Sequence, residues 1–201
     1  MSKVDDNKKQ KKQALYQAAF DLFTEKGFAK TTISEIAERS GLAKGTFYLY
    51  FQDKYELRDD LVAYKSSQLL DNAYGALEKV QSDSFEQEMF LLTDYIIARF
   101  KDEPALLRFI SKNLSWGIFK NAFTTAEYPS SRQFPEHYLQ ALDRHGISCP
   151  SPELMLFTLV ELIGATCHSC ILYNQPVDMD TYLPYLHQAL KGILDSFTSQ
   201  A

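Results

Sequence analysis

Residues 31–57, TTISEIAERSGLAKGTFYLYFQDKYEL, constrain the fold more than any other part of the chain. Thr32 is followed three residues later by Glu35, which is the spacing of a capping box at the start of a helix. Gly41 stands where a residue in the left-handed conformation would end that helix. The segment therefore predicts two short helices joined by a tight turn, with a third helix starting directly after them.

The second short helix is expected to begin near Lys44, in the sequence KGTFYLYF. Phe47 and Phe51 lie four residues apart, so they share one face of a helix and are predicted to point inward. Tyr48 lies on a different face and is predicted to be exposed. Exposed tyrosines, a lysine and a threonine on a short helix after a tight turn are typical of a helix that enters the major groove of DNA.

A helix N-terminus offers unpaired N–H groups and a partial positive charge, both of which suit phosphate oxygens. The residues expected to contact phosphates, which position a protein without reading sequence, are Thr32, Tyr50 and Lys54. The residues expected to contact base edges are Lys44, Gly45, Thr46 and Tyr48. The alternative for the two tyrosines is that both are aromatic residues of the core.

Residues 10–65 resemble the TetR family of bacterial transcriptional regulators. The resemblance lies in the first-helix pattern ALYQAAFDLFTEKGFAKTT, in ISEIAERSGLAKGTFYLYF, and in DKYEL after it. It implies an all-helical homodimer with a helix-turn-helix head, a ligand-binding body and a palindromic operator, and more often a repressor than an activator. Beyond residue 65 no motif supports the resemblance, so the body is matched by topology alone.

The distribution of charge separates the two ends of the chain, whose net charge is −5. Residues 1–55 hold ten Lys/Arg and seven Asp/Glu, whereas the remainder holds eleven and nineteen. A basic head and an acidic body would orient the molecule on DNA. Five lysines precede the first helix, namely Lys3, Lys8, Lys9, Lys11 and Lys12. They form either an arm that follows the DNA backbone or a solubilising tail.

The remaining sequence has the periodicity of helices and no strand alternation of useful length. The predicted fold class is all-α, with about nine helices. We expect a three-helix DNA-binding domain in residues 1–55, with the helix-turn-helix at about 32–51. Residues 56–201 would form a larger helical domain for effector binding and dimerisation.

Two boundaries in the body follow from local signals. Asp53 and Glu56 repeat the capping box and start a helix that is expected to continue to about Val80. This helix would link the head to the body and transmit a signal between them. A further helix is expected to run from Asp102 through Phe119, and it is apolar on most sides, which predicts that it is buried.

Apolar side chains recur at steps of three and four in the last two predicted helices. They are Val160, Gly164, Cys167 and Ile171 in the first helix, and Leu183, Leu186, Leu190, Ile193 and Phe197 in the second. Two such helices from each subunit would form a four-helix interface across a two-fold axis. The alternative is that these stripes pack only inside one subunit.

The middle of the body is rich in aromatic residues, which are typical of small-molecule pockets between helices. The pocket candidates are Tyr95, Phe109, Trp116, Phe119 and Phe123. Glu161 and His168 lie on a polar stripe of an otherwise apolar helix, and a carboxylate there would hold a cationic ligand. The alternatives are an ordinary aromatic core and, for Glu161, a salt bridge across the dimer interface or exposure to solvent.

The three cysteines, Cys149, Cys167 and Cys170, are an odd number and imply no disulfide framework. Cys167, His168 and Cys170 lack a second ligand pair at a spacing suited to zinc, so we interpret the last two thiols as small buried side chains at a helix interface. No metal and no cofactor are expected.

The sequence contains no Gly-rich phosphate loop after a strand, no HExxH and no GxSxG, so no enzyme activity is predicted. It also shows no secretory signal and no apolar run of about 18 residues, which predicts a cytoplasmic protein without a membrane partner. The expected partners are a double-stranded DNA operator, a small hydrophobic or cationic effector and a second copy of the chain. The alternative is a DNA-binding regulator that a protein partner controls and that has no ligand pocket.

Overall fold

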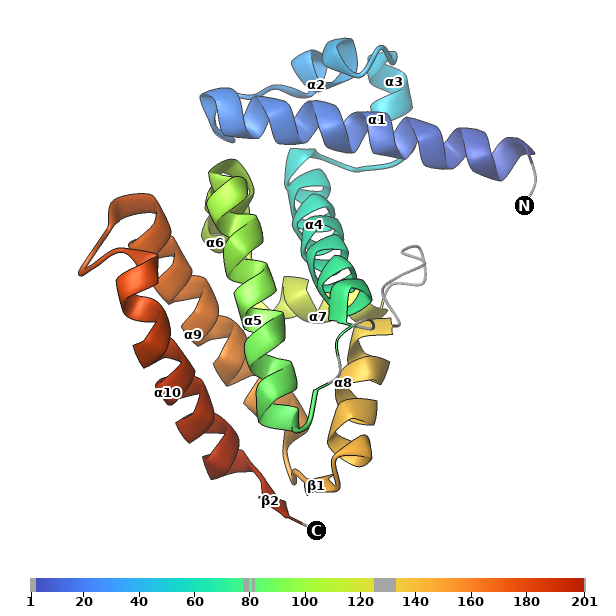
Figure 1. Ribbon diagram of the computed structural model, residues 1–201. Coiled ribbons are helices and arrows are strands. Elements are labelled where there is room, and N and C mark those ends of the chain that lie inside the picture. Colours follow the sequence, from blue (N-terminus) through green and yellow to red (C-terminus); the bar gives the residue numbers. More distant parts are fainter. Residues whose placement is uncertain (1–2, 78–79, 81, 125–132, 201) are drawn as a thin grey trace. The chain divides into compact units, whose positions relative to one another are not determined.

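The computed structural model describes residues 3–77, 80, 82–124 and 133–200. Within these residues the chain forms ten α-helices and one short antiparallel strand pair (Figure 1). It divides into two compact units, Met1–Ala63 and Tyr64–Ala201. The division falls inside α4 (Lys54–Leu77), later than the boundary that the sequence predicted after residue 55.

The first unit contains three helices and the first part of α4. These helices are α1 (Lys3–Lys26), α2 (Ile33–Arg39) and α3 (Lys44–Phe47). α2 packs against α1 and α3 against α2, and all three surround one apolar core (Figure 1). The fully buried side chains at the centre of this core are Leu15, Ala19, Ile36, Phe47, Leu57 and Leu61.

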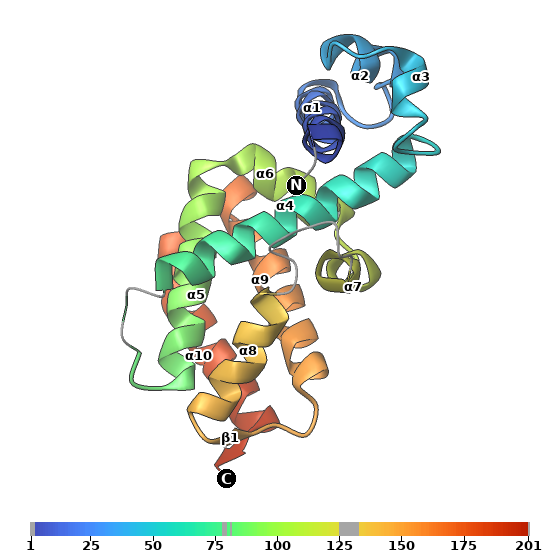
Figure 2. The ribbon, with the colours of Figure 1, turned by 90° about the vertical axis from the view of Figure 1, so that its right-hand side faces the viewer.

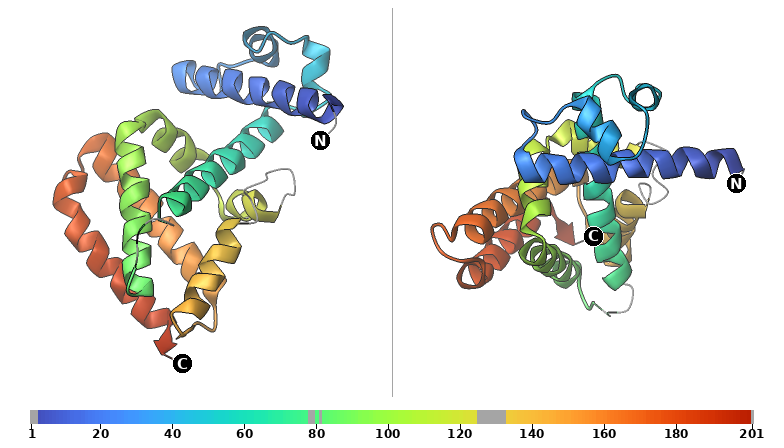
Figure 3. Two further views of the ribbon diagram at one scale, coloured as in Figure 1. Left: turned by 45° about the vertical axis from the view of Figure 1, so that its right-hand side comes forward. Right: turned by 90° about the horizontal axis from the view of Figure 1, so that it is seen from above.

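The first helix begins earlier than the sequence predicted, at Lys3 rather than near residue 9. Its first turns extend past α2 and α3, as the view from above in Figure 3 shows. Lys8, Lys9 and Lys11 lie exposed on this extension. These three lysines are therefore carried on a helix and not on a disordered tail.

The second unit is also helical. Its elements are α5 (Phe85–Asp102), α6 (Pro104–Asn113), α7 (Trp116–Thr124), α8 (Gln133–Arg144), β1 (Ile147–Ser148), α9 (Pro152–Tyr173), α10 (Met179–Phe197) and β2 (Ser199–Gln200). α9 packs against α5, α6 and α10, and α5 packs against α6 and α10. The strands pair with Ile147 opposite Gln200, at the ends of α8 and α10 (Figure 2). The all-α fold class is confirmed.

The helix expected from Asp102 through Phe119 is two helices, which accounts for ten helices rather than about nine. α6 ends at Asn113, and Leu114 has an extended backbone with ψ of 126°. The Ser115 hydroxyl then accepts a hydrogen bond from the Ile118 N–H at 3.3 Å and starts α7. Serine competes for backbone groups in this way and favours helix starts over helix interiors. This signal was present in the sequence, but the apolar residues around it masked it.

Two predicted helix ends are confirmed by their backbone angles. Gly27 ends α1 with φ of +88°, and Gly41 follows α2 with φ of +69°. Other residues adopt this left-handed region only with strain, so glycine suits both positions. The turn between α2 and α3 depends on the second of these glycines.

The helix α9 corrects the expectation that no segment is long and apolar enough for a membrane span. Its 22 residues include an 18-residue window with a mean hydropathy of 1.7, although only 22% of that window is buried. Length and composition alone do not distinguish a membrane helix from the interface helix of a globular protein. Packing against α5, α6 and α10 explains one face of α9, and its exposed face requires another explanation.

The expected burial of Cys167 and Cys170 is confirmed, because both lie in the interior of the second unit. Burial raises the pKa of the Cys167 thiol to about 12 and also raises the pKa of Cys170. A thiol with a raised pKa is a poor nucleophile and a poor metal ligand. Among the described residues, no three His, Cys, Asp or Glu side chains gather as metal ligands would.

Candidate nucleic-acid interface

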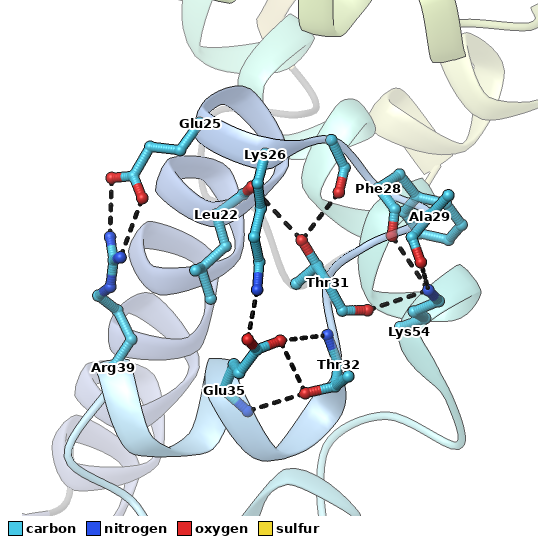
Figure 4. Close-up of polar contacts among 11 residues, drawn as sticks. Leu22, Glu25, Lys26, Phe28, Ala29, Thr31, Thr32, Glu35, Arg39 and Lys54 are labelled. Carbon is cyan, nitrogen blue, oxygen red and sulfur yellow. Dashed lines mark hydrogen bonds and ion pairs between the residues drawn. The ribbon is translucent and has the colours of Figure 1, made fainter.

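The helix-turn-helix begins with the capping box that the sequence predicted. The Thr32 hydroxyl accepts a hydrogen bond from the Glu35 N–H at 3.3 Å, and the Glu35 carboxylate accepts one from the Thr32 N–H at 2.9 Å (Figure 4). The hydroxyl also donates to Glu35 Oε2 at 2.8 Å. Thr32 is exposed at the start of α2, but its hydroxyl already serves the cap, so a phosphate there would have to share it.

Two ion pairs hold α2 against α1 (Figure 4). Arg39 donates two hydrogen bonds to the Glu25 carboxylate, each of 2.9 Å, and Lys26 donates to Glu35. The contact with Lys26, followed by the hydrogen bonds from Thr32, lowers the pKa of Glu35 to about 2. A bidentate arginine–carboxylate pair fixes orientation as well as distance, so these contacts set the direction in which α2 leads into α3.

Lys54 lies at the start of α4 and holds the connection between α1 and α2. Its Nζ donates to the carbonyls of Phe28 and Thr31, both at 3.0 Å, and to that of Ala29 at 3.4 Å (Figure 4). An ammonium group has three N–H donors, and three carbonyls take them all. Lys54 therefore has a structural role inside the head, and a phosphate at its ammonium group would compete with these carbonyls.

α3 is shorter than predicted, because it ends at Phe47 and the chain continues to Phe51 in turns. The N–H groups of Tyr50 and Phe51 both donate to the Phe47 carbonyl, at 2.9 and 3.0 Å. Phe47 and Phe51 are buried with their ring centroids 5.8 Å apart, which confirms the predicted inward pair. The two rings hold the segment between them on the surface.

That segment exposes Tyr48 and Leu49, with relative accessibilities of 51% and 79%. The core alternative is thus excluded for Tyr48, whereas Tyr50 is half-buried with its ring centroid 6.4 Å from that of Phe51. Sequence analysis did not single out Leu49. The signal was available, because inward positions at 47 and 51 leave the three residues between them facing out.

The other predicted base-contact residues lie on the same short stretch. Lys44 and Gly45 are exposed, and Thr46 is half-buried. The structure therefore brings Lys44, Gly45, Thr46, Tyr48 and Tyr50 together on α3 and the turn after it. A lysine, a threonine and tyrosines on one exposed element can reach both phosphates and base edges.

The described side chains among the predicted pocket residues differ in their burial and in their neighbours. Phe109 and Phe119 are buried, and Trp116 stacks on Phe119 with ring centroids 5.3 Å apart. Glu161 is exposed, and the ring of His168 meets that of Tyr173 edge-on at 5.3 Å. Tyr95 is half-buried on α5. The side chain of Phe123 lies outside the described part of the chain.

A cavity of about 200 Å³ lies instead among α4, α5 and α8. Its lining residues are Tyr74, Leu77, Val80, Ser82, Glu88, Leu91, His137, Gln140 and Arg144. None of the six predicted pocket residues with described side chains belongs to this set. Glu88 is a buried carboxylate in the wall of this cavity, with 6% of its surface exposed, whereas Glu161 is exposed.

Only some of the residues predicted for the dimer interface on α9 and α10 are accessible at the surface of one protomer. Cys167, Leu186 and Leu190 are buried within one protomer and cannot contact a partner, so the alternative of packing inside one subunit is correct for them. The residues Val160, Gly164, Ile171, Leu183, Ile193 and Phe197 are half-buried. The exposed apolar side chains of the two helices include Leu154 and Tyr185, at 58% and 64%.

Residues 15–61 match the family model of bacterial regulatory proteins, tetR family. The chain is 35% identical over 89 residues to the uncharacterized HTH-type transcriptional regulator YvdT of Bacillus subtilis (strain 168). This aligned segment covers 42% of this chain and 46% of YvdT. It is 22% identical over 186 residues to the regulator YhgD of the same organism, covering 91% of this chain and 96% of YhgD.

Among solved structures, a putative tetR family transcription regulator from Shewanella sp. PV-4 has a TM-score of 0.66 at 18% identity, over 94% of this chain and 99% of that one. The chain thus spans less than half of YvdT, while the likeness to the Shewanella protein extends over the whole fold. The matching N-terminal segment, the shared all-helical fold and the geometry of α2 and α3 agree with one another. Residues 15–61 are thus those of a bacterial regulatory protein of the tetR family, and the chain as a whole has a fold similar to that of the Shewanella regulator.

Proposed function

We propose that this protein is a cytoplasmic repressor that binds a palindromic operator as a homodimer and leaves it when a small effector binds the body. The observation that carries the proposal is the exposure of Lys44, Gly45, Tyr48 and Leu49 on a short stretch that the buried rings of Phe47 and Phe51 fix to the core. Exposed apolar and aromatic side chains cost solubility unless a partner covers them. Base edges and thymine methyl groups offer the matching chemistry in a major groove.

The chemistry of each side chain on this surface suggests whether it contacts bases or phosphates. Lys44, Gly45, Thr46 and Tyr48 approach the bases in our proposal, and Tyr50 and the exposed N-terminus of α2 at Thr32 approach phosphates. Lys8, Lys9 and Lys11 on the first turns of α1 add positive charge beside the duplex. Lys54 contributes only by holding the head together.

The dimer would form through the exposed faces of α9 and α10. Leu154 and Phe157 are exposed on α9, and Tyr185 is exposed on α10. Apolar residues of this size on two neighbouring helices support a four-helix contact between two copies. Such a contact would also explain why a helix as apolar as α9 has so little of its surface buried in one protomer.

The route from effector to operator would be α4. This continuous helix begins at Lys54, which is hydrogen-bonded inside the head, and ends beside the cavity with Tyr74 and Leu77 in the cavity wall. An effector that prefers one position of α4 would change the spacing of the two heads. Linkage then requires that operator binding lowers the affinity for the effector by the same factor by which effector binding lowers the affinity for the operator.

The test is selection of bound duplexes from a random DNA library at physiological salt. A palindromic motif is the expected outcome, because non-specific phosphate binding falls steeply with salt and base readout survives. Tyr48→Ala should remove the enrichment without unfolding the head. Absence of any enriched motif, with folded protein at every salt concentration, would contradict the proposal.

A further inference from the structure

The cavity among α4, α5 and α8 contains a negative charge in its wall. Glu88 is 6% exposed and lines the cavity from α5. Burial of a carboxylate costs free energy unless cations or hydrogen-bond donors compensate its lost hydration. The chemistry of the cavity therefore depends on how well its neighbours compensate Glu88.

The two cationic or donor groups beside the Glu88 carboxylate make only long contacts with it. Arg144 Nη2 reaches Glu88 Oε1 at 3.5 Å, and His145 Nε2 lies 3.2 Å from Glu88 Oε2. Strong charge-assisted hydrogen bonds are about 2.7 to 2.9 Å long, so both contacts are long. The Arg144 side chain is 59% exposed, and its guanidinium can return to water at low cost. The negative charge is thus buried, and its principal cation lies at the surface.

Two further polar atoms in the cavity wall lack a partner. Tyr74 Oη and His137 Nδ1 are buried and make no hydrogen bond in the part of the chain that the structure describes. Tyr74 itself is 6% exposed, and its ring centroid lies 5.3 Å from that of His137. Burial, and then the charge of Glu88, raises the pKa of the Tyr74 phenol. Unpartnered buried polar groups in a native protein call for an explanation, and an absent ligand is one.

The three groups have one property in common. Glu88 Oε1, Tyr74 Oη and a His137 Nδ1 without its proton each accept a hydrogen bond. A primary ammonium ion has three N–H donors and one positive charge. Leu77, Val80 and Leu91 give the cavity an apolar part that suits a short hydrocarbon group, beside the neutral polar side chains of Ser82 and Gln140. A volume of about 200 Å³ is smaller than a drug-sized site, which excludes large ligands.

We propose that this cavity binds a small primary amine in its ammonium form, which displaces Arg144 from Glu88 and also engages Tyr74 and His137. The inference rests on the proposed function in one respect, namely that this site is where the effector acts. Deep negative charge and exposed positive charge together favour a cation over an anion, since solvent screens Arg144 more than Glu88.

The probes are benzylammonium, benzyl alcohol and benzoate, which have similar shapes and carry positive, zero and negative charge. Titration calorimetry on the full chain at neutral pH should give the tightest binding for benzylammonium. The preference over benzyl alcohol should be at least about tenfold, because only the cation gains an ion pair with a buried carboxylate. Equal binding of the three probes, preference for benzoate, or no binding of any probe would overturn the proposal.

Three variants place the site. Glu88→Gln should weaken benzylammonium binding by at least about tenfold. Arg144→Gln should strengthen benzylammonium binding, because the guanidinium that competes for the Glu88 carboxylate is removed. Glu86→Gln is the matched control, since Glu86 lies on the same helix and pairs with Lys191 of α10 outside the cavity. If Glu88→Gln fails to fold, Arg144→Gln still decides the question, and weaker benzylammonium binding to it would refute the site.

The failure of this inference can be separated from failure of the proposed function. The same proteins are tested for binding to the selected operator, with and without benzylammonium. Operator binding without amine binding would refute the ammonium site and leave the repressor proposal intact. Amine binding that leaves operator affinity unchanged would support the site and reject its role as the effector site.

Discussion

Two polar clusters, one in each unit, differ in how well their hydrogen bonds are satisfied. In the head, Lys54 donates to three carbonyls, and Arg39 makes two hydrogen bonds of 2.9 Å to Glu25. In the body, Glu88 has only long contacts, and Tyr74 Oη has no partner among the described residues. Satisfied contacts hold the helix-turn-helix in one geometry, whereas long or missing contacts leave unused hydrogen-bonding capacity in the cavity wall.

The largest expected effect tests whether the buried Phe47 supports the exposed residues of α3 and of the turn after it. Phe47→Ala should lower the free energy of unfolding by about 3 to 5 kcal/mol, because it leaves a cavity at a fully buried position. Denaturant unfolding followed by circular dichroism measures the change. Leu49→Ala, at the most exposed position of the same segment, should stay within about 0.5 kcal/mol of the parent. Equal losses would mean that the two side chains are not divided between core and surface.

The next effect separates structural from DNA-contacting lysines. Lys54→Met should lower the free energy of unfolding by about 1 to 3 kcal/mol, because three carbonyls lose a charged donor. It should leave the salt dependence of operator binding unchanged. Lys44→Met should keep the stability and should lower the preference for the operator over unrelated DNA, as expected for a residue that contacts base edges. A reduced slope for Lys54→Met would restore Lys54 as a phosphate contact.

A pair of tyrosine substitutions compares the two units directly. Tyr16 Oη donates to Asp60 at 2.6 Å in the head, so Tyr16→Phe should destabilise the protein by about 1 to 2 kcal/mol. Tyr74→Phe removes a buried hydroxyl without a partner and should be neutral or stabilising by up to about 1 kcal/mol. Thermal unfolding of both variants beside the parent measures the difference. Destabilisation by Tyr74→Phe comparable to that of Tyr16→Phe would show that the body satisfies its polar groups as the head does.

The smallest effect is a pH dependence in the head. The folded-state pKa of Glu35 is lowered from 4.5 to about 2, chiefly by Lys26. Its ionised carboxylate therefore contributes stability above about pH 4.5, and this contribution is lost as the pH falls towards 2. Unfolding measured at several pH values should show Glu35→Gln less stable than the parent at neutral pH, with the gap closing in acid. A gap that is constant with pH would indicate loss of hydrogen bonds alone.

The head could be predicted because its signals are local. The spacing of Thr32 and Glu35 fixes a cap, and the four-residue step between Phe47 and Phe51 fixes an inward face. The length of α3 was not predictable in the same way, because helix propensity does not show where hydrogen bonding changes to turns. The role of Lys54 also escaped prediction, since its carbonyl partners lie more than twenty residues earlier in the chain.

The body could be predicted as helices but not as a site. Glu88 meets Arg144 and His145 only after α5 and α8 pack, across more than fifty residues of sequence. The apolar stripe through Leu186 and Leu190 shows that one face of α10 is covered, and periodicity does not reveal whether the same subunit or a partner covers it. The separation of α6 from α7 was missed because apolar content outweighed a single serine.

The division of the chain inside α4 has a consequence for how such proteins can vary. One residue inserted near Tyr64 would turn everything after it by about 100° about the helix axis and advance it by about 1.5 Å. The contacts within the apolar core of each unit would be kept, because both partners of each such contact lie on the same side of the insertion. A change of length at this point would therefore rotate the residues that follow it without altering the packing inside either unit.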